Sequence, residues 1–316
     1  MRIGLIDVDA EFRGRVTFPN LSLMKISAYH KAMGDHVEWY NPMFSGHMDK
    51  VYMCKVFSDE YTADYQWAID ADEVIKGGSG YAISIVDGKE HHDKTRDADL
   101  PNEIEHIMPD YSIYGVKDTA YGFLTRGCPR GCSFCHVASM QGRRVRTVAR
   151  LQEFWDGQKN IELMDPNLTA SHEWAMHMGD LQKSGAWVSF NQGLDIGLMD
   201  EKKIEDLNRL KWKRIHFAWD KPEDDYAERF SMVMDRLCKA SRGTVSAYVL
   251  TNNGSTLNED LRRIMILRKL NIQPYVMIYR KPTAPKWNIQ LQRWVNNPQL
   301  FWSNESFERY LEVGRK

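Results

Sequence analysis

Three of the five cysteines in this chain of 316 residues stand close together and could bind a metal as a set. Cys128, Cys132 and Cys135 have the spacing C-x3-C-x2-C, whereas Cys54 and Cys238 are isolated. A 4Fe-4S cluster normally takes four thiolates. Three cysteines without a nearby fourth therefore predict a cluster with one iron atom open to a small molecule.

Four other uses of this cysteine loop fit its residues less well. A zinc site could add His136, but that residue is adjacent to Cys135, and neighbouring residues rarely close a tetrahedron. The run from Cys132 to His136 also matches the C-x-x-C-H pattern of haem attachment, which leaves Cys128 unused. A two-cluster ferredoxin would need a further cysteine where the chain has Ser139. Buried structural cysteines fit poorly with a loop rich in glycine, proline and arginine.

The composition is that of an ordinary globular protein, with 43% hydrophobic and 27% charged residues. The formal net charge of -1 argues against a basic, nucleic-acid-binding surface spread over the whole chain. Asp7 and Asp9 interrupt the apolar N-terminus, and no later apolar run is long enough to span a membrane. We therefore expect a cytoplasmic protein without a membrane partner.

The first part of the chain alternates short apolar runs with longer segments. The runs are residues 2–8, 36–41, 50–57 and 73–78. Residues 21–33 have helical spacing and end at Gly34, so the pattern predicts a small parallel, Rossmann-like sheet. The charged residues 87–112 are typical of a surface connection. We predict a first domain, with its linker, over residues 1–115.

A second alternation follows and predicts an α/β fold of six strands over residues 116–285, which would close as a parallel barrel or as the partial barrel that the resemblance described below implies. The expected strands are residues 121–126, 161–165, 187–191, 214–220, 244–251 and 273–279. The expected helices are residues 144–157, 171–184, 200–210, 223–240 and 257–269. Such folds carry their chemistry at the carboxyl ends of the strands, and the cysteine loop directly follows the first strand. The aromatic tail, residues 286–316, is expected to be a packing cap.

At the cysteine loop the sequence resembles the radical S-adenosylmethionine (SAM) superfamily, whose motif carries an aromatic residue before the last cysteine, here Phe134. The resemblance implies that Cys128, Cys132 and Cys135 hold a 4Fe-4S cluster and that SAM chelates the open iron. It implies reductive cleavage of SAM to a 5′-deoxyadenosyl radical. It also implies an external electron donor, such as a flavodoxin- or ferredoxin-like protein.

The same resemblance places the SAM contacts on loops that follow the strands. Many members carry Gly-Gly-Glu after the second strand, where this chain has Asp165-Pro166-Asn167. Asp165 and Asn167 could bind the SAM ammonium, although an aspartate before a proline is also a common turn. Other strand-end residues suited to ribose, adenine or substrate are Gln192, Asp220 and Asn252, with their neighbours Asn191 and Asn253. No catalytic residue is identified.

The first 110 or so residues resemble, more weakly, the cobalamin-binding domain that precedes the barrel in one group of radical SAM enzymes. The likeness lies in the order of elements and in Gly77-Gly78 after a strand, residues that a simple turn would also use. Asp9 stands where the related D-x-H-x-x-G pattern has its cobalt-binding histidine. Cobalamin is therefore left open. If bound, it should lie near Asp7, Asp9 and the two glycines, without a protein nitrogen on cobalt.

The leading hypothesis is a radical SAM enzyme that begins hydrogen abstraction or methyl transfer on an unidentified substrate. The alternative is a non-catalytic binding protein in which iron-sulfur or zinc only stabilises a loop. Formation of 5′-deoxyadenosine separates the two, because only the enzyme should produce it.

Overall fold

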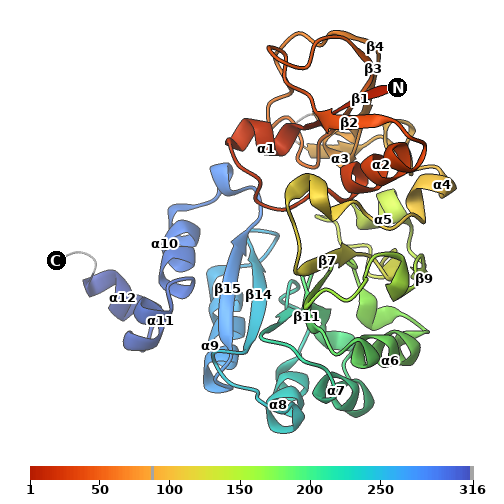
Figure 1. Cartoon of the computed structure of the whole chain (residues 1–316). Helices are drawn as coiled ribbons and strands as arrows, with labels where there is room; N and C mark the ends of the chain where they lie inside the picture. Colours follow the sequence, from red (N-terminus) through yellow and green to blue (C-terminus); the bar gives the residue numbers. More distant parts are fainter. Residues whose placement is uncertain (87–88, 314–316) are drawn as a thin grey trace. The chain divides into compact units, whose positions relative to one another are not determined.

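The computed structural model describes residues 1–86 and 89–313, which divide into two compact units (Figure 1). Unit 1 consists of Met1–Gly122, His136–Arg143 and Ala149–Gln158. Unit 2 consists of Phe123–Cys135, Arg144–Val148 and Lys159–Lys316. The division into three domains expected from the sequence stays a prediction.

Unit 1 is built on a parallel sheet with the strand order β2-β1-β3-β4. Its strands are β1 (Arg2–Asp7), β2 (His36–Trp39), β3 (Met48–Cys54) and β4 (Ala71–Gly77). Helix α2 (Leu21–Ala32) connects β1 to β2 and packs Leu23 and Ile26 against Ile3 and Leu5. The predicted Rossmann-like sheet is confirmed, because four parallel strands with a helical crossover define that architecture.

Shorter elements complete unit 1. They are α1 (Val8–Arg13), α3 (Ser79–Ala82), β5 (Ile83–Val86), β6 (Lys89–His92), α4 (Asn102–Glu105), β7 (Thr119–Gly122) and α5 (Val137–Gln141). The stretch expected to be a surface connection contains β6 and α4, and its residues 87–88 lie outside the described part of the chain.

Unit 2 contains the predicted series of parallel strands and helices. β10 (Asn160–Leu163) pairs in parallel with β11 (Trp187–Phe190). A second parallel sheet has the order β12-β13-β14-β15. Its strands are β12 (Leu194–Asp195), β13 (Ile215–Ala218), β14 (Val245–Thr251) and β15 (Gln273–Ile278). The predicted α/β class is confirmed.

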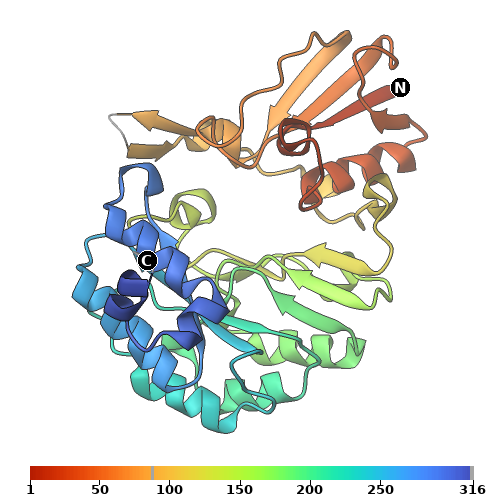
Figure 2. The same ribbon diagram turned by 90° about the vertical axis from the view of Figure 1, so that its left-hand side faces the viewer.

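Four helices follow the strands of unit 2 in the predicted places and lie along their outer side (Figure 2). They are α6 (Trp174–Ser184), α7 (Glu201–Asn208), α8 (Ala227–Arg236) and α9 (Leu257–Lys269). Phe217 of β13 meets Phe230 of α8 edge-on, with ring centroids 6.0 Å apart. His216 and Ala218, the alternate residues of β13, are only partly buried. One face of this sheet therefore packs under helices while the other is open.

The prediction of a helix over residues 144–157 is wrong. Arg146–Thr147 form a short strand, β9, which pairs antiparallel with β8 (Thr125–Arg126). Only a single 3₁₀ turn, Leu151–Glu153, follows. Pairing with β8 provides hydrogen bonds for the backbone N–H and C=O groups that a helix would otherwise have paired internally.

The last helices of the described residues are α10 (Lys286–Val295), α11 (Pro298–Ser303) and α12 (Phe307–Val313). Trp294 lies at the centre of their aromatic cluster, with centroid distances of 5.0 Å to Phe301 and 5.6 Å to Phe307. Among the helices of the described residues, none is long and apolar enough to cross a membrane.

Candidate functional site

The three clustered cysteines lie in the loop that leaves β8. Cys128 and Cys132 are half-buried and Cys135 is exposed. Gly127 and Gly131 have φ angles of 94° and 56°, in the left-handed region that favours glycine. The backbone N–H of Cys135 donates to the carbonyl of Cys132 at 3.1 Å. The loop thus turns back on itself and keeps its thiols accessible.

The donor types in this loop fit an iron-sulfur cluster. Within residues 1–86 and 89–313, no three His, Cys, Asp or Glu side chains are grouped as a single metal ion requires. Thiolates that bind a 4Fe-4S cluster need not surround a single ion, because each binds its own iron atom. His136, considered as a zinc ligand, has its Nε2 3.0 Å from Glu90 Oε2 in unit 1.

Asp165, in the loop after β10, holds the base of the cysteine loop. Its side chain is buried, at 4% exposure. The carboxylate accepts hydrogen bonds from the Thr125 N–H (2.5 Å), the Thr125 hydroxyl (2.7 Å) and the Leu124 N–H (3.2 Å). Burial raises the pKa of Asp165 to about 6 against the effect of these hydrogen bonds. Both oxygens therefore position the loop, and contact with SAM stays a prediction for this residue.

Asn167 connects the cysteine loop to a second loop of unit 2. Its Nδ2 lies 3.5 Å from Cys128 Sγ and donates to Asp195 Oδ2 at 3.1 Å. Asp195 also accepts from Arg130 of the cysteine loop, through Nε at 2.7 Å and Nη2 at 2.5 Å. Such a bidentate pair fixes both distance and orientation. The segment between the first two cysteines is thereby fastened to the end of β12.

The other side-chain atom of Asn167 has no partner. Asn167 is 5% exposed, and its Oδ1 is buried without a hydrogen-bond donor among the described residues. A buried unpaired acceptor costs about 1–3 kcal/mol. Native proteins keep few such groups, and each one requires an explanation. A ligand that binds beside the cysteine loop and donates a hydrogen bond to Asn167 Oδ1 would explain this unpaired atom.

Asp220 lies just past β13 and is partly buried. Burial raises its pKa to about 6, and the negative charge of Asp195 adds to the rise. The positive charges of Arg263 and Arg130 oppose it. At neutral pH the group is therefore mostly a carboxylate, which can accept hydrogen bonds from hydroxyl groups.

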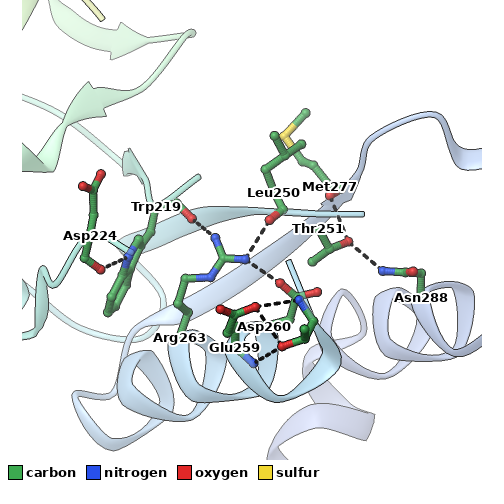
Figure 3. Close-up of polar contacts among 10 residues, drawn as sticks. Trp219, Asp224, Leu250, Thr251, Glu259, Asp260, Arg263, Met277 and Asn288 are labelled. Atoms are coloured by element: carbon green, nitrogen blue, oxygen red, sulfur yellow. Dashed lines mark hydrogen bonds and ion pairs between the residues drawn. The ribbon is translucent and has the colours of Figure 1, made fainter. Parts of the chain in front are cut away.

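Arg263 of α9 ties together the ends of β13 and β14 (Figure 3). Its buried guanidinium donates to the carbonyls of Trp219 at 2.6 Å and Leu250 at 2.8 Å, and to Asp260 Oδ1 at 2.5 Å. The Trp219 carbonyl belongs to the peptide bond that precedes Asp220. The arginine therefore fixes the backbone that presents the Asp220 carboxylate.

The remaining predicted residues lie in turns at the same strand ends. Asn252 adopts a φ of 60° and donates from Nδ2 to the Tyr279 carbonyl at 2.7 Å, which joins the ends of β14 and β15. Gln192 is exposed, whereas the Nδ2 of its neighbour Asn191 is buried without a partner among the described residues. Phe134 is half-buried in the cysteine loop.

Sequence reasoning missed the residues that assemble these parts. Arg130 and Asp195 are 65 positions apart, so no local pattern joins them. The Asp260 and Arg263 pair has the spacing of a solvent-exposed helix pair, yet both side chains are buried. An arginine placed between two candidate ligands, in a loop of otherwise small residues, was the one available signal.

The carboxyl edge of the unit 1 sheet carries the two predicted acids, Asp7 and Asp9. Asp7 accepts from the Ala10 N–H at 3.1 Å and from the Tyr114 hydroxyl at 2.7 Å. Burial raises the pKa of Asp7. Asp9 accepts from the Val56 N–H at 2.6 Å. Both carboxylates therefore hold the chain's own loops.

The two glycines after β4 differ in their surroundings. Gly78 has a φ of 97°, and a Cβ there would lie 2.4 Å from the Lys55 carbonyl oxygen. Internal packing alone therefore requires a glycine at this position. A Cβ on Gly77 would meet no atom within 4 Å.

No protein-family model matches the chain, and the search of curated proteins found no match. Among solved structures, the fold is similar to the radical S-adenosylmethionine methyltransferase TsrM from Kitasatospora setae, determined with cobalamin and a [4Fe-4S] cluster bound. The TM-score is 0.59 at 11% sequence identity, over 88% of this chain and 72% of that chain. At this identity the likeness establishes the fold. The chain therefore has the fold of a radical SAM enzyme with an N-terminal Rossmann-like sheet, and the resemblance drawn from the cysteine loop is confirmed at that level.

Proposed function

We propose that this protein is a radical SAM enzyme that holds a 4Fe-4S cluster on Cys128, Cys132 and Cys135 and binds SAM beside it. The observation that carries the proposal is a loop of three accessible thiols next to the buried, unpartnered Oδ1 of Asn167. The loop stands at the carboxyl end of its strand, where βα folds place their chemistry. The shared fold with TsrM supports the same reading.

When bound, the cluster supplies the electron that cleaves the sulfonium of SAM into methionine and a 5′-deoxyadenosyl radical. Asn167 has two roles in the proposed site. Its Nδ2, which points at Cys128 Sγ, donates a hydrogen bond to the thiolate, and such bonds tune the reduction potential of a cluster. Its Oδ1 accepts a hydrogen bond from the SAM amino group, which satisfies the orphaned atom.

Asp220 and the neighbouring strand ends bind the nucleoside part of SAM in this proposal. The Asp220 carboxylate accepts from the ribose hydroxyls, and Gln192 and Asn252 supply amide groups for further hydrogen bonds. Arg263 keeps Asp220 in place through the Trp219 carbonyl. Asp165 does the same for the cysteine loop through Thr125.

The proposed start of the reaction leads to hydrogen abstraction or, when cobalamin is held by unit 1, to methyl transfer. The open side of Gly77, at the carboxyl edge of a parallel sheet, is consistent with a bulky ligand there. The cobalamin bound in TsrM supports this branch. A flavodoxin- or ferredoxin-like donor in the cytoplasm would supply the electron.

The test is SAM cleavage by the full chain, reconstituted anaerobically with iron and sulfide and reduced with dithionite. We expect 5′-deoxyadenosine by mass spectrometry, and none from Cys132→Ala. Cys238→Ala is the matched control, because Cys238 is exposed and isolated in sequence. An iron-loaded protein that leaves SAM intact would favour the non-catalytic iron-sulfur alternative. Stoichiometric zinc without iron in freshly isolated protein would favour a zinc-stabilised loop.

A further inference from the structure

Three aromatic rings form a continuous surface across neighbouring strands of unit 2, and we call them the aromatic shelf: His216 of β13, Tyr248 of β14 and Tyr275 of β15. The His216 and Tyr248 rings stack at a centroid distance of 5.4 Å and an interplanar angle of 19°. Tyr275 meets Tyr248 edge-on at 5.8 Å and 88°. Tyr248 and Tyr275 are direct partners in the strand register.

The shelf lies on the open face of its sheet. Phe217, the neighbour of His216, points the other way and packs on α8 through Phe230. Successive side chains of a strand alternate between faces, so His216 points away from that helix. Tyr275 is 47% exposed, and Met277, the next residue on the same face of β15, is 46% exposed. Grouped aromatic and apolar side chains on an exposed face are typical of interaction sites.

The polar groups of the shelf are arranged to leave hydrogen bonds for a ligand. His216 Nδ1 lies 2.5 Å from Ser246 Oγ, which occupies one ring nitrogen and leaves Nε2 available. Burial and, to a smaller extent, the nearby charge of Arg214 lower the pKa of His216. The imidazole is therefore neutral at neutral pH. Within the described part of the chain, the hydroxyls of Tyr248 and Tyr275 make no hydrogen bond.

The shelf adjoins the proposed SAM site. Gly193 follows Gln192 directly and has a φ of 77°. A Cβ at Gly193 would lie 3.1 Å from the His216 carbonyl oxygen and 3.7 Å from Tyr248 Cε2. The turn that carries Gln192 therefore rests against the shelf, and the positive φ and close approach favour glycine at position 193. A molecule on the shelf would lie next to the strand ends assigned to SAM.

We propose that the aromatic shelf binds a planar aromatic ring, and that this ring is the substrate group presented to the radical chemistry. An aromatic ring can continue both geometries seen here, the stacked pair and the edge-on pair, at the 4.5–7 Å spacing of aromatic contacts. The Nε2 of His216 and the tyrosine hydroxyls can then bond polar groups in the plane of the ring. The role as substrate site rests on the proposed function, whereas ring binding does not.

The chemistry of the shelf is shared by two sources of ring, an aromatic amino-acid side chain and a nucleobase. The probes are therefore L-tyrosine and guanosine, with L-leucine and ribose as their counterparts without an aromatic ring. Saturation-transfer NMR on the reconstituted full chain, with SAM present, measures which protons contact the protein. We expect the ring protons of one or both aromatic probes to receive the strongest saturation, and the probe that binds identifies the source.

Variants of the shelf sharpen the test. Tyr248→Ala and Tyr275→Ala should each weaken probe binding at least tenfold, because each removes one ring of the surface. Tyr275→Phe should retain most of the binding. Trp67→Ala is the control, since Trp67 is an aromatic residue of unit 1 with 69% exposure. Circular dichroism establishes that each variant is folded, and Tyr275→Ala is the variant least able to disturb the core because half of its side chain is exposed.

The failures can be told apart. Absence of ring-proton saturation from both aromatic probes, or equal binding to folded alanine variants, would overturn the shelf as a ring site. If wild-type protein cleaves SAM in that case, the proposed function stands. If the probes bind as expected but SAM is never cleaved, the ring site stands and its assignment as a substrate site is overturned.

Discussion

The two units of this protein each carry a parallel sheet with acidic residues at its carboxyl edge, but they use those residues differently. In unit 1, the carboxylates of Asp7 and Asp9 accept hydrogen bonds from groups of the same unit, namely the Ala10 N–H, the Tyr114 hydroxyl and the Val56 N–H. In unit 2, Asp165 likewise holds a loop, yet that loop presents three accessible thiols. Beside it, Asn167 keeps a buried acceptor without a partner.

The difference shows that position at a strand end does not identify a binding residue. Both edges have the location that open α/β sheets use for ligands. The hydrogen bonds of the strand-end residues distinguish the two edges. A carboxylate whose oxygens all accept hydrogen bonds from the protein positions the chain, whereas a buried polar atom without a partner can bind a ligand. Among these strand-end residues, this criterion favours Asn167 of unit 2 as a ligand contact over Asp7 and Asp9 of unit 1.

The largest expected effect comes from the thiols. Changing Cys128, Cys132 or Cys135 to alanine should abolish both cluster assembly and SAM cleavage, since each thiolate binds its own iron. Cys54→Ala should assemble the cluster normally, because burial raises the pKa of that thiol in unit 1 to about 12 and keeps it protonated. Iron and sulfide analysis of each variant measures the effect. A cluster lost with Cys54 but retained without Cys132 would reverse the comparison.

The next effect concerns Asp165. Asp165→Ala leaves the amides of Leu124 and Thr125 without their acceptor, so we expect a loss of about 3 kcal/mol in the free energy of unfolding at pH 7. Urea unfolding measures it. Asp156→Ala is the control, because Asp156 is an exposed aspartate. Equal stability of the two variants would contradict the positioning role.

Asp165 also predicts a pH dependence. Its folded pKa of about 6 lies above the ordinary value of 3.8, so the native state binds more protons than the unfolded state between these pH values. The contribution of this group to stability therefore falls by roughly 3 kcal/mol as pH rises from about 4 to 6. Asp165→Asn removes that titration. The difference between wild type and Asp165→Asn in urea unfolding should vary across this range, and a constant difference would contradict the assignment.

A smaller effect is expected at Asn167. Asn167→Ala removes the proposed acceptor for the SAM amino group, and loss of this one hydrogen bond should weaken SAM binding by roughly tenfold. Anaerobic calorimetry of SAM binding to the reconstituted protein measures it. Asn258→Ala, an exposed asparagine of α9, should bind SAM like the wild type. Unchanged affinity for SAM in Asn167→Ala would contradict the proposed hydrogen bond between Asn167 Oδ1 and SAM.

The smallest effect is expected at Asp9. Its carboxylate accepts from the Val56 N–H and from the Phe57 N–H, so it should not bind cobalt. With added cobalamin, the Co(II) paramagnetic resonance should lack splitting from a protein nitrogen and should be the same in Asp9→Asn. Nitrogen splitting from a protein histidine would contradict this account of unit 1. Failure to retain cobalamin under excess ligand would remove the methyl-transfer branch.

The sequence was sufficient where structure depends on local patterns. Short apolar runs located the strands of both units, and the expected helix over residues 257–269 is α9. The cysteine spacing located the loop. Local patterns failed at residues 144–157, because Arg146 and Thr147 pair with a strand about twenty residues earlier in the chain.

The contacts that build the site depend on distant partners and were out of reach. Asp165 was found as a strand-end residue, but only the structure shows that Thr125 and Leu124 occupy its oxygens. The Arg130 and Asp195 pair joins two loops that no periodicity relates. Burial was equally hidden, since nothing in the residues around Arg263 distinguishes a buried guanidinium from an exposed one.

The central claim is that the loop of unit 2 holds a cluster with an iron open to SAM. Electron paramagnetic resonance of the reduced, reconstituted full chain, recorded before and after addition of SAM, tests it most directly. The account predicts the signal of a reduced 4Fe-4S cluster and a change in its g-values when SAM binds. A cluster signal that SAM leaves unmoved, or zinc in place of iron in the freshly isolated protein, would contradict it.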